Sequence, residues 1–546
     1  MMAQNLPMKD ADQGSSKDAM AYDAIIIGAG HNGLTTAAYL AKAGLRTLVV
    51  ERRGSVGGAA STEDIFPGFR VDTGGRDAGL FLPQIVADLS LENYGLRWIE
   101  PPALVFAPQP DGKALTLWRD PQRSVDEIAR FSQKDAQRYP DFLRLVSRFS
   151  SILGEMMALT PPTLPELRSG ELVPWLGTAL RVKRLGDHDM MEFMRSLPMP
   201  VEDFLDEWFE SGALKAAIGA GAVTGSFLGP KSSGTVFTLL YQDAHAGKTA
   251  FRSSRFVQGG TGCLSEALAE AARQRGAKIR MDADVRCILI EEGRAIGIEL
   301  ASGEQIRARC VVSSADPVHT FFGLVGAPQL EVRTVREVKN IRLRASLSRV
   351  NLAVSHLPAF AGATEGGSPE RLGGHILICP SLEYLERAYD QAKYGNFTSL
   401  PMLDLTIPTV NDPGLAPGDA HLLCINLYTT PYSLSEGDWD SNRERLQDIT
   451  VQTLEGYAPG LRDSLLHSQV LTPLDLERQF GLTGGDIYHG QMGLDQVLMT
   501  RPIPGSARYR TPVEGLYLCG AGSHPGGGVT GVPGYNAARE ILKDLS

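Results

Sequence analysis

The chain has 546 residues, 43% of them hydrophobic and 21% charged, which is enough for two or three folded domains. Its formal net charge of -10 argues against nucleic acid as the main partner, because phosphate binding needs clustered Lys and Arg. No stretch approaches the roughly 20 consecutive apolar residues of a membrane-spanning helix. These features are typical of an ordinary folded protein.

The first 21 residues differ from the rest of the chain. They contain charged residues such as Lys9, Asp10 and Lys17 but no apolar core. They match neither a secretory signal nor an Arg-rich transit peptide. We therefore expect residues 1–21 to form a disordered tail and the protein to be cytoplasmic.

The glycine pattern Gly28-Ala-Gly30-His-Asn-Gly33 follows an apolar run and opens a stretch suited to a helix, and a second apolar run then ends in Glu51. In such a unit Gly28 permits the tight turn out of the strand, Gly30 lets the backbone approach a pyrophosphate, and Gly33 lets the helix pack on the strand. The helix N-terminus attracts phosphate, and Glu51 can accept hydrogen bonds from ribose hydroxyls. This pattern predicts a dinucleotide-binding unit.

Further glycines follow directly after this unit, at Gly54, Gly57, Gly58, Gly74 and Gly75. Their density next to a nucleotide-binding strand indicates backbone that runs close beside a flat ligand. A plain surface loop is the alternative, and composition alone does not decide between the two.

Residues 83–250 show helical periodicity, which predicts helices at 124–131, 136–153, 201–209 and 214–220. Methionines accumulate in this part of the chain. They are either ordinary core residues or the lining of a pliable apolar channel. The methionines concerned are Met156, Met157, Met190, Met191, Met194 and Met199.

The nucleotide unit resumes near residue 255, with a helix predicted at 264–276 and a meander of short strands at 283–312. A second insertion then reaches residue 490. In it we predict strands at 347–354, 375–379, 403–407 and 421–428 and a helix at 441–457.

A strand, a glycine-rich turn and a helix are predicted at 515–520, 521–531 and 532–545. They would bring a second helix N-terminus to the same ligand. The alternation along the chain predicts two interleaved domains. The first would comprise residues 22–82, 255–317 and 491–546, and the second residues 83–254 and 318–490.

Three glycine segments in this order resemble the FAD-binding flavoprotein family of phytoene desaturases and amine oxidases. The likeness extends from Tyr22 to the C-terminus and is strongest to desaturase-like carotene ketolases and to the group of pyridine nucleotide-disulfide oxidoreductase domain-containing protein 2. The resemblance implies an α/β fold, in which a Rossmann-type FAD-binding domain is interleaved with an α+β substrate domain. The segments that carry the likeness are 27–33, 259–262, 486–489, 494–496, 501–502 and 522–528.

The resemblance also implies FAD as the cofactor and a role for each matching residue. One group would cradle the pyrophosphate, Glu51 would bind the adenosine ribose, and the backbone of Val285 would meet the adenine. The glycine pair would pass near the flavin, and the C-terminal turn would contact the diphosphate and the pyrimidine side of the ring. The residues that would cradle the pyrophosphate are Gly28, Gly30 and Gly33. The glycine pair and the residue after it are Gly57, Gly58 and Ala59, and the residues of the C-terminal turn are Gly522, Gly527, Gly528 and Val529.

Ala59 departs from the pattern, because many amine oxidases carry Arg directly after the glycine pair. This difference moves the prediction away from amine oxidases and toward desaturases and ketolases. The chain also has no CxxC pair for disulfide chemistry and no metal-ligand motif.

The flavin itself would carry the reaction, by accepting a hydride from an activated C–H bond. His524 is the candidate catalytic residue, because its turn is expected near the flavin; a hydrogen bond that shapes the loop is the alternative. His31 is expected to pack in the phosphate loop, and Tyr488 and His489 to face the substrate.

We expect the protein to desaturate or oxygenate a hydrophobic substrate of carotenoid or isoprenoid type. Such a substrate would bring peripheral contact with a membrane, and a fully soluble enzyme is the alternative. No feature of the sequence selects an oligomeric state. A different class of function also stands open, that of an FAD-binding protein with a regulatory or interaction role.

Overall fold

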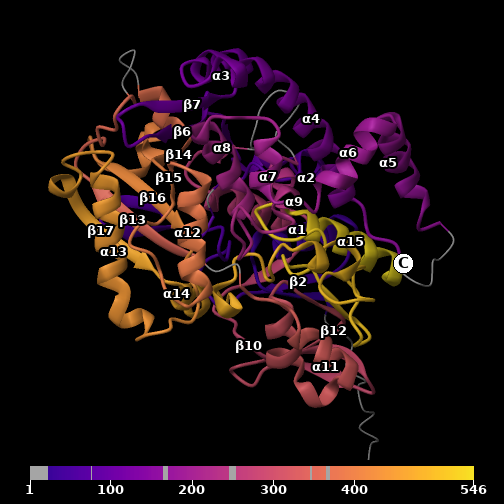
Figure 1. Cartoon of the computed structure of the whole chain (residues 1–546). Helices are drawn as coiled ribbons and strands as arrows, with labels where there is room; N and C mark the ends of the chain where they lie inside the picture. Colours follow the sequence, from indigo (N-terminus) through magenta and orange to yellow (C-terminus); the bar gives the residue numbers. More distant parts are fainter. Residues whose placement is uncertain (1–21, 76, 164–169, 245–253, 345–346, 364–368) are drawn as a thin grey trace, which may run out of the picture.

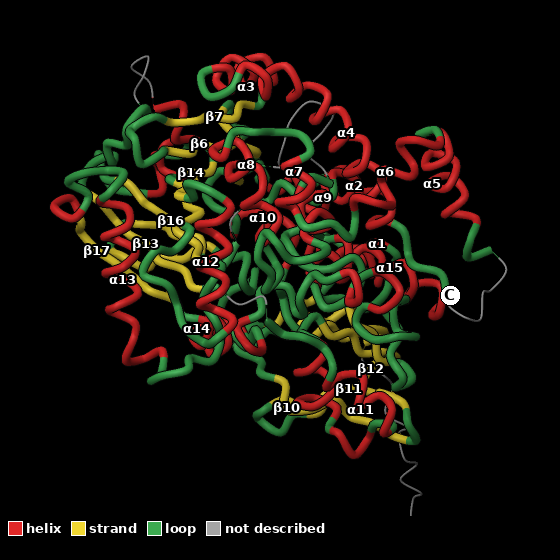
Figure 2. The backbone as a smooth tube through the Cα atoms, in the orientation of Figure 1, coloured by secondary structure: helices red, strands yellow, loops and turns green. Residues whose placement is uncertain are grey.

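The computed structural model describes residues 22–75, 77–163, 170–244, 254–344, 347–363 and 369–546. Within these residues the chain builds two large β-sheets with helices packed around them (Figures 1 and 2). The sheet that contains β1 is called sheet 1, and the sheet that contains β13 is called sheet 2. Residues 1–21, for which we expect a tail, lie outside the described residues.

Sheet 1 has a parallel core with a small antiparallel extension. Its strand order is β10-β11-β12-β1-β2-β9, and β18 pairs in parallel with β12. The apolar residues of β1 and β2 are buried, as is typical of parallel strands covered on both faces. The meander expected at 283–312 is confirmed. The strands are β1 (Tyr22–Ile27), β2 (Thr47–Val50), β9 (Lys278–Arg280), β10 (Val285–Glu291), β11 (Arg294–Leu300), β12 (Gln305–Ser313) and β18 (Leu516–Leu518).

Beside sheet 1, α1 (His31–Lys42) packs against both α10 (Gly262–Arg273) and α15 (Val532–Leu545). The Thr36 hydroxyl donates a hydrogen bond of 3.1 Å to the carbonyl oxygen of Gly534, so that α1 and α15 meet directly. A Cβ atom at Gly534 would lie 2.1 Å from the carbonyl oxygen of Asn32, so this approach requires glycine. The first and last helices of the described residues therefore lie side by side.

Sheet 2 is antiparallel except where β14 pairs with β6. Its order is β17-β13-β16-β15-β14-β6-β7, and an apolar core lies between it and α13 (Trp439–Glu455). The strands expected in the second insertion are confirmed. They are β13 (Ser348–Val354), β14 (His375–Ile378), β15 (Leu403–Thr406) and β16 (His421–Leu427). The sheet also contains strands that the sequence did not predict: β17 (Leu465–Leu471) and, from the first insertion, where only helices were expected, β6 (Ala103–Pro108) and β7 (Ala114–Trp118).

A helical layer from the first insertion packs near sheet 2, at the top and right of Figure 1. It shares a large apolar core with residues of β6, β7 and β14, and the four helices expected there are confirmed. The helices are α3 (Pro121–Ala129), α4 (Gln133–Ala158), α5 (Val173–Arg184), α6 (Asp187–Ser196), α7 (Val201–Asp206), α8 (Gly212–Gly219) and α9 (Thr235–Gln242).

Shorter elements join these layers. They are α2 (Pro83–Leu89), α11 (Val332–Lys339), α12 (Leu382–Lys393), α14 (Pro473–Phe480), β3 (Thr62–Phe66), β4 (Phe69–Asp72), β5 (Trp98–Ile99) and β8 (Phe256–Val257). Strands of sheet 1 come from residues 22–50, 278–313 and 516–518, and those of sheet 2 from 103–118 and 348–471. The interleaved α/β architecture is therefore confirmed, while the residue boundaries of the two domains stay predictions.

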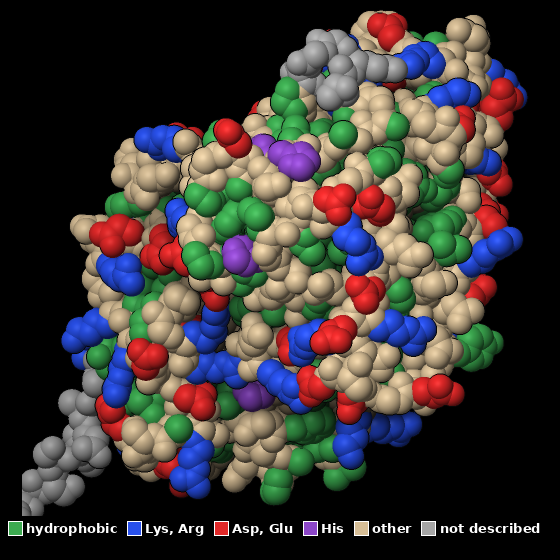
Figure 3. All heavy atoms as spheres, turned by 90° about the vertical axis from the view of Figure 1, so that its left-hand side faces the viewer, with side chains coloured by type: hydrophobic (Ala, Val, Ile, Leu, Met, Phe, Trp, Pro, Cys, Tyr) green, Lys and Arg blue, Asp and Glu red, His purple; other side chains and the backbone are tan. Residues whose placement is uncertain are grey.

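The face seen in Figure 3 mixes Lys and Arg with Asp and Glu side chains, and its hydrophobic side chains are scattered among them. In the part of the chain that the structure describes, no helix combines the length and the apolarity needed to cross a bilayer.

A buried carboxylate fixes α15 to the segment that precedes β18. The side chain of Glu540 is 0% exposed and lies 2.9 Å from Arg508, 2.8 Å from Arg510 and 2.6 Å from Lys543. Burial alone would raise the pKa of Glu540, but hydrogen bonds from Lys543 and Arg510 and the charge of Arg508 lower it from 4.5 to about 2. Glu540 therefore stabilises the fold in its charged form.

We expect Glu540→Gln to lower the free energy of unfolding by about 3 kcal/mol at pH 7, because three cations lose their buried partner. The folded pKa lies below the ordinary value, so this stabilisation is present above pH 4.5 and disappears as the pH falls toward 2. Thermal unfolding across pH 2–7 would show the stabilities of the wild type and of Glu540→Gln converging in acid. The control Glu514→Gln removes an ion pair whose carboxylate is 72% exposed and should change little. A difference in stability between the wild type and Glu540→Gln that stays constant with pH would contradict this account.

Candidate functional site

One large cavity is lined from both sheets. It encloses about 1580 Å³ of space between atoms, counting the part open to solvent. Ile27, Val50 and Ser314 line it at the carboxyl ends of β1, β2 and β12. This edge of a parallel sheet is where α/β proteins bind their ligands.

The first glycine motif forms the floor of the cavity. Gly28 has a φ of +94°, and its N–H donates to the carbonyl oxygen of Val50 at 2.8 Å. A Cβ at Gly33 would lie 2.2 Å from the carbonyl oxygen of Gly28, so the expected close packing of helix on strand is confirmed. Gly33 itself does not line the cavity. Gly30 does, and as the N-cap of α1 it leaves the helix N-terminus without a side-chain cap.

Glu51 lines the cavity at the end of β2. One carboxylate oxygen accepts a hydrogen bond of 2.7 Å from the N–H of Ala29, and the other accepts one of 3.0 Å from the N–H of Arg53. The N–H of Ala283 donates to the carbonyl oxygen of Glu51 at 2.8 Å, which brings Val285 to the same end of the cavity. We call this part the nucleotide end.

The glycine-rich segment of residues 57–75 packs over the turn that contains Gly28 and Gly30. The N–H of Gly57 donates to the carbonyl oxygen of Ala29 at 2.9 Å, and the N–H of Gly75 donates to that of Ala59 at 2.8 Å. Gly57, Ala59 and Gly75 line the cavity, together with Gly58 and Gly74. The segment is therefore part of a ligand-sized cavity and not a plain surface loop.

The C-terminal turn reaches the cavity with only some of the expected residues. Gly528 and Val529 line it, whereas Gly522 and Gly527 do not. A Cβ at Gly527 would lie 2.1 Å from the Tyr488 ring, and one at Gly522 would lie 2.4 Å from Pro317. Gly527 and Gly522 therefore allow close packing, and a contact of any of these four residues with the ligand stays a prediction.

His524 corrects an expectation. Its turn does lie beside the cavity, but the imidazole is fully buried outside the lining, with Nε2 3.3 Å from the carbonyl oxygen of Met156. Burial lowers its pKa to about 4. The side chain points toward the end of α4, which favours the loop-shaping alternative over a catalytic role.

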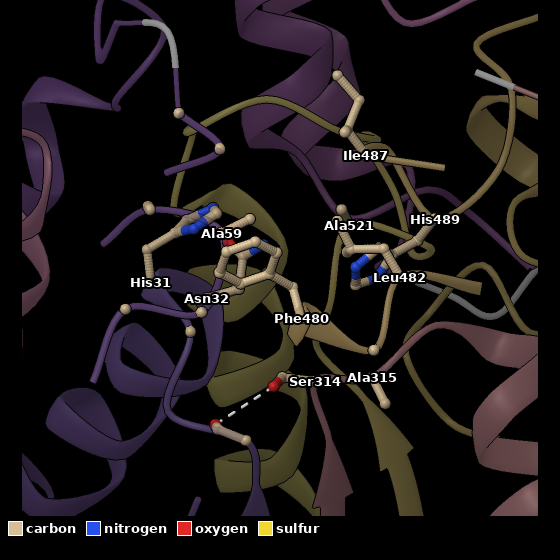
Figure 4. A pocket seen from close by; sticks show the side chains of 18 of the residues that line it. His31, Asn32, Ala59, Ser314, Ala315, Phe480, Leu482, Ile487, His489 and Ala521 are labelled. Atoms are coloured by element: carbon tan, nitrogen blue, oxygen red, sulfur yellow. Dashed lines mark hydrogen bonds between the residues drawn. The ribbon is translucent and has the colours of Figure 1, made fainter. Parts of the chain in front are cut away.

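His31 and His489, by contrast, both line the cavity (Figure 4). Nε2 of His31 and Nδ1 of His489 are buried and have no hydrogen-bond partner among the described residues, and the same holds for Oδ1 of Asn32. Burial is the main cause that lowers the pKa of each histidine, for His31 to about 4. Neutral imidazoles with unsatisfied atoms are typical of a site that holds a polar ligand.

A buried guanidinium holds the segment of His489 in place. Arg501 is 1% exposed and donates to the carbonyl oxygens of Tyr488 at 2.6 Å, Gly490 at 3.1 Å and Ala521 at 2.7 Å. Burial lowers the pKa of Arg501 to about 10. It joins the second insertion to the turn after β18, and both segments line the cavity.

The other end of the cavity faces sheet 2 and the helical layer, and we call it the apolar end. Its apolar lining residues belong to the large core shared by these two layers. The methionines of the first insertion do not line it: Met191 and Met194 are exposed, and Met157 packs in the core. The alternative of a Met-rich channel is therefore wrong for this cavity. The apolar residues are Leu80, Leu347, Leu482 and Ile487.

A histidine between two carboxylates adjoins this end. Nδ1 of His375 lies 2.9 Å from Asp404 and Nε2 lies 3.2 Å from Asp77, which itself lines the cavity. Sequence reasoning missed these residues. Asp77 follows the Gly74-Gly75 pair, which was a usable signal, but His375 and Asp404 stand in ordinary strands that meet only in the sheet. Among the described residues, no group of three or more His, Cys, Asp or Glu side chains is arranged to hold a metal ion.

Comparisons with known proteins agree with this geometry. The family model described as flavin containing amine oxidoreductase matches residues 33–320. Pyridine nucleotide-disulfide oxidoreductase domain-containing protein 2 of Rattus norvegicus is 36% identical, over 96% of this chain and 94% of its own. A limonene dehydrogenase subunit of Castellaniella defragrans is 28% identical, over 96% and 95%. In fold the chain is similar to a solved oxidoreductase from Methanosarcina mazei, with a TM-score of 0.60 at 17% identity over 95% and 100% of the two chains.

FAD is the cofactor, and the cavity fits it. The uncapped N-terminus of α1 suits a diphosphate, and the carboxylate of Glu51 lies where a ribose is expected. The unsatisfied atoms of His31 and Asn32 offer further hydrogen bonds on the same side. The assignment of single residues to single groups of FAD stays a prediction.

We expect Gly33→Ala to weaken FAD binding at least tenfold, because the added Cβ must push α1 away from the turn at Gly28. The dissociation constant of FAD, measured by quenching of flavin fluorescence on the apoprotein, checks this. Gly177→Ala in α5 is the matched control, since its Cβ would meet no atom within 4 Å. Equal FAD affinity of the two variants would contradict the packing argument.

Proposed function

Since the chain belongs to the family of flavin containing amine oxidoreductases, we propose that this FAD-dependent oxidoreductase oxidises a largely apolar small molecule of isoprenoid type. The observation that carries the proposal is the continuity of the cavity. The nucleotide end, with Glu51, passes without a break into the apolar end, with Leu80 and Leu347. A cofactor and an apolar substrate can therefore lie in contact.

One relative supports the substrate class. The limonene dehydrogenase subunit is named for a terpene hydrocarbon and is similar to this chain over 95% of its length. Ala59, in the cavity lining, brings no charge to the position where many amine oxidases carry Arg. Both observations favour desaturation or oxidation of an isoprenoid over amine oxidation.

The chemistry requires removal of a hydride and a proton from the substrate. FAD, when bound, supplies the acceptor for the hydride. The chain must take up the proton, and the carboxylate of Asp77 is in the cavity with His375 at 3.2 Å behind it. We propose that Asp77 accepts the proton from the substrate and that His375, held by Asp404 at 2.9 Å, takes it up at Nε2 and becomes a cation between the two carboxylates.

We infer that apolar side chains of the lining exclude water from the reacting atoms once cofactor and substrate fill the cavity. Leu482 and Ile487 come from the second insertion, and Phe480 lies at 4.9 Å from the guanidinium of Arg53 in a cation–π contact across the cavity. A dry site strengthens every charge interaction inside it.

Anaerobic mixing of the holoenzyme with isoprenoids such as limonene tests the function. We expect bleaching of the flavin absorbance as the substrate is oxidised, followed by its return when oxygen or a quinone is admitted. Amines should leave the flavin oxidised. A flavin that stays oxidised with every isoprenoid and every amine would favour the alternative, an FAD-binding protein with a regulatory or interaction role.

His375→Gln should slow flavin reduction by the best substrate by roughly 100-fold, because glutamine cannot take up a proton from Asp77. Stopped-flow absorbance measures the rate constant, and FAD affinity should stay unchanged. His467→Gln, at an exposed position of β17, is the matched control. An unaltered rate in the first variant would remove His375 from the proton path.

A further inference from the structure

The apolar end of the cavity contains two polar atoms that nothing in the described chain satisfies. They are Oγ1 of Thr224 and Oδ1 of Asn426. Each residue is 3% exposed and each lines the cavity. Buried polar side-chain atoms of folded proteins almost always have a partner, so two orphans in one ligand cavity indicate a group that a ligand supplies.

Packing holds Thr224 at the cavity wall. It follows the short helix of residues 220–223, and the next residue, Gly225, has a φ of +75°. A Cβ at Gly225 would lie 1.7 Å from the Tyr488 ring, so the backbone at this point is pressed against an aromatic side chain. The backbone that carries Thr224 is therefore held in place beside the cavity.

Strand pairing in sheet 2 holds Asn426 at the cavity wall. Asn426 stands in β16 between Arg349 of β13 and Asp404 of β15. Its Nδ2 donates to the hydroxyl of Tyr428 at 3.3 Å, which fixes the orientation of the amide and leaves Oδ1 to accept a bond. A ligand that carries an O–H or N–H group can satisfy this oxygen.

The two atoms belong to the substrate side of the site. Thr224 comes from the helical layer and Asn426 from sheet 2, whereas the glycine motifs expected to hold FAD come from sheet 1. A bare hydrocarbon would cover both atoms, exclude water from them and give them no hydrogen bond. Each unsatisfied atom of this kind weakens binding by roughly five- to 100-fold.

We propose that the substrate is an apolar molecule with one hydrogen-bonding head group, a hydroxyl, which Asn426 and Thr224 recognise. A hydroxyl can donate to Oδ1 of Asn426 and share a bond with the hydroxyl of Thr224. This inference rests on the proposed function and narrows its substrate class. Sites built to hydrogen-bond such a group reject the analogue that lacks it far more strongly than apolar pockets reject an extra methylene.

The test compares limonene with perillyl alcohol, which differs from it by a single hydroxyl. Each compound is titrated into the oxidised holoenzyme, and the perturbation of the flavin absorbance gives its dissociation constant. We expect the alcohol to bind at least tenfold more tightly than the hydrocarbon. In Thr224→Val and in Asn426→Leu this ratio should fall at least threefold, while the affinity for limonene stays equal or rises.

Thr238→Val in α9 is the matched control. Thr238 is 0% exposed and its Oγ1 also lacks a partner among the described residues, but it does not line the cavity. The same chemical change there should leave the ratio of the two affinities unaltered.

Three outcomes would overturn the inference. Equal or tighter binding of limonene by the wild-type holoenzyme would show that the orphan atoms do not select the substrate, and the proposed function would stand. Loss of FAD from Thr224→Val or Asn426→Leu, but not from Thr238→Val, would assign the atoms to the cofactor. Binding of neither compound would remove the isoprenoid function together with the inference.

Discussion

The site depends on backbone packed directly against backbone around the first turn of α1. On one side Gly33 lies so close to the carbonyl oxygen of Gly28 that a Cβ would come within 2.2 Å of it. On the other side Gly534 of α15 approaches the carbonyl oxygen of Asn32 equally closely. This double contact places the helix N-terminus at the carboxyl ends of β1 and β2, where its unpaired N–H groups can meet a phosphate.

A second layer of contacts ties the insertions to this centre. Arg501 donates to the carbonyl oxygens of Tyr488, Gly490 and Ala521, so that one buried guanidinium joins segments from both parts of the chain. A buried charge of this kind is tolerated because carbonyl oxygens satisfy it. Hydrogen bonds therefore hold the cavity wall beside His489, as close packing holds the glycine floor, and the two together border the space for the cofactor.

The apolar end shows how a hydrophobic lining and polar chemistry coexist. Leu80 and Leu347 extend the core of the helical layer up to the cavity, and Asp77, with His375 and Asp404 behind it, brings a chain of titratable groups to the same place. Low polarity around these groups makes each of their interactions stronger than it would be in water. An oxidation that releases a proton benefits from this combination.

The sequence by itself determined the dinucleotide unit, the order of the insertions and most of the strands, but it missed β9 of sheet 1 and β6, β7 and β17 of sheet 2. These features are local: Gly28, Gly33 and Glu51 act within one strand–turn–helix unit, and apolar runs mark strands wherever they are buried. Tertiary structure alone decided which side chains face the cavity. Asn426 and His375 stand in ordinary strands and meet the site only through sheet pairing. His524 lies in the expected turn, yet packing against α4 turns its imidazole away, because the direction of a buried side chain depends on neighbours that are distant in the chain.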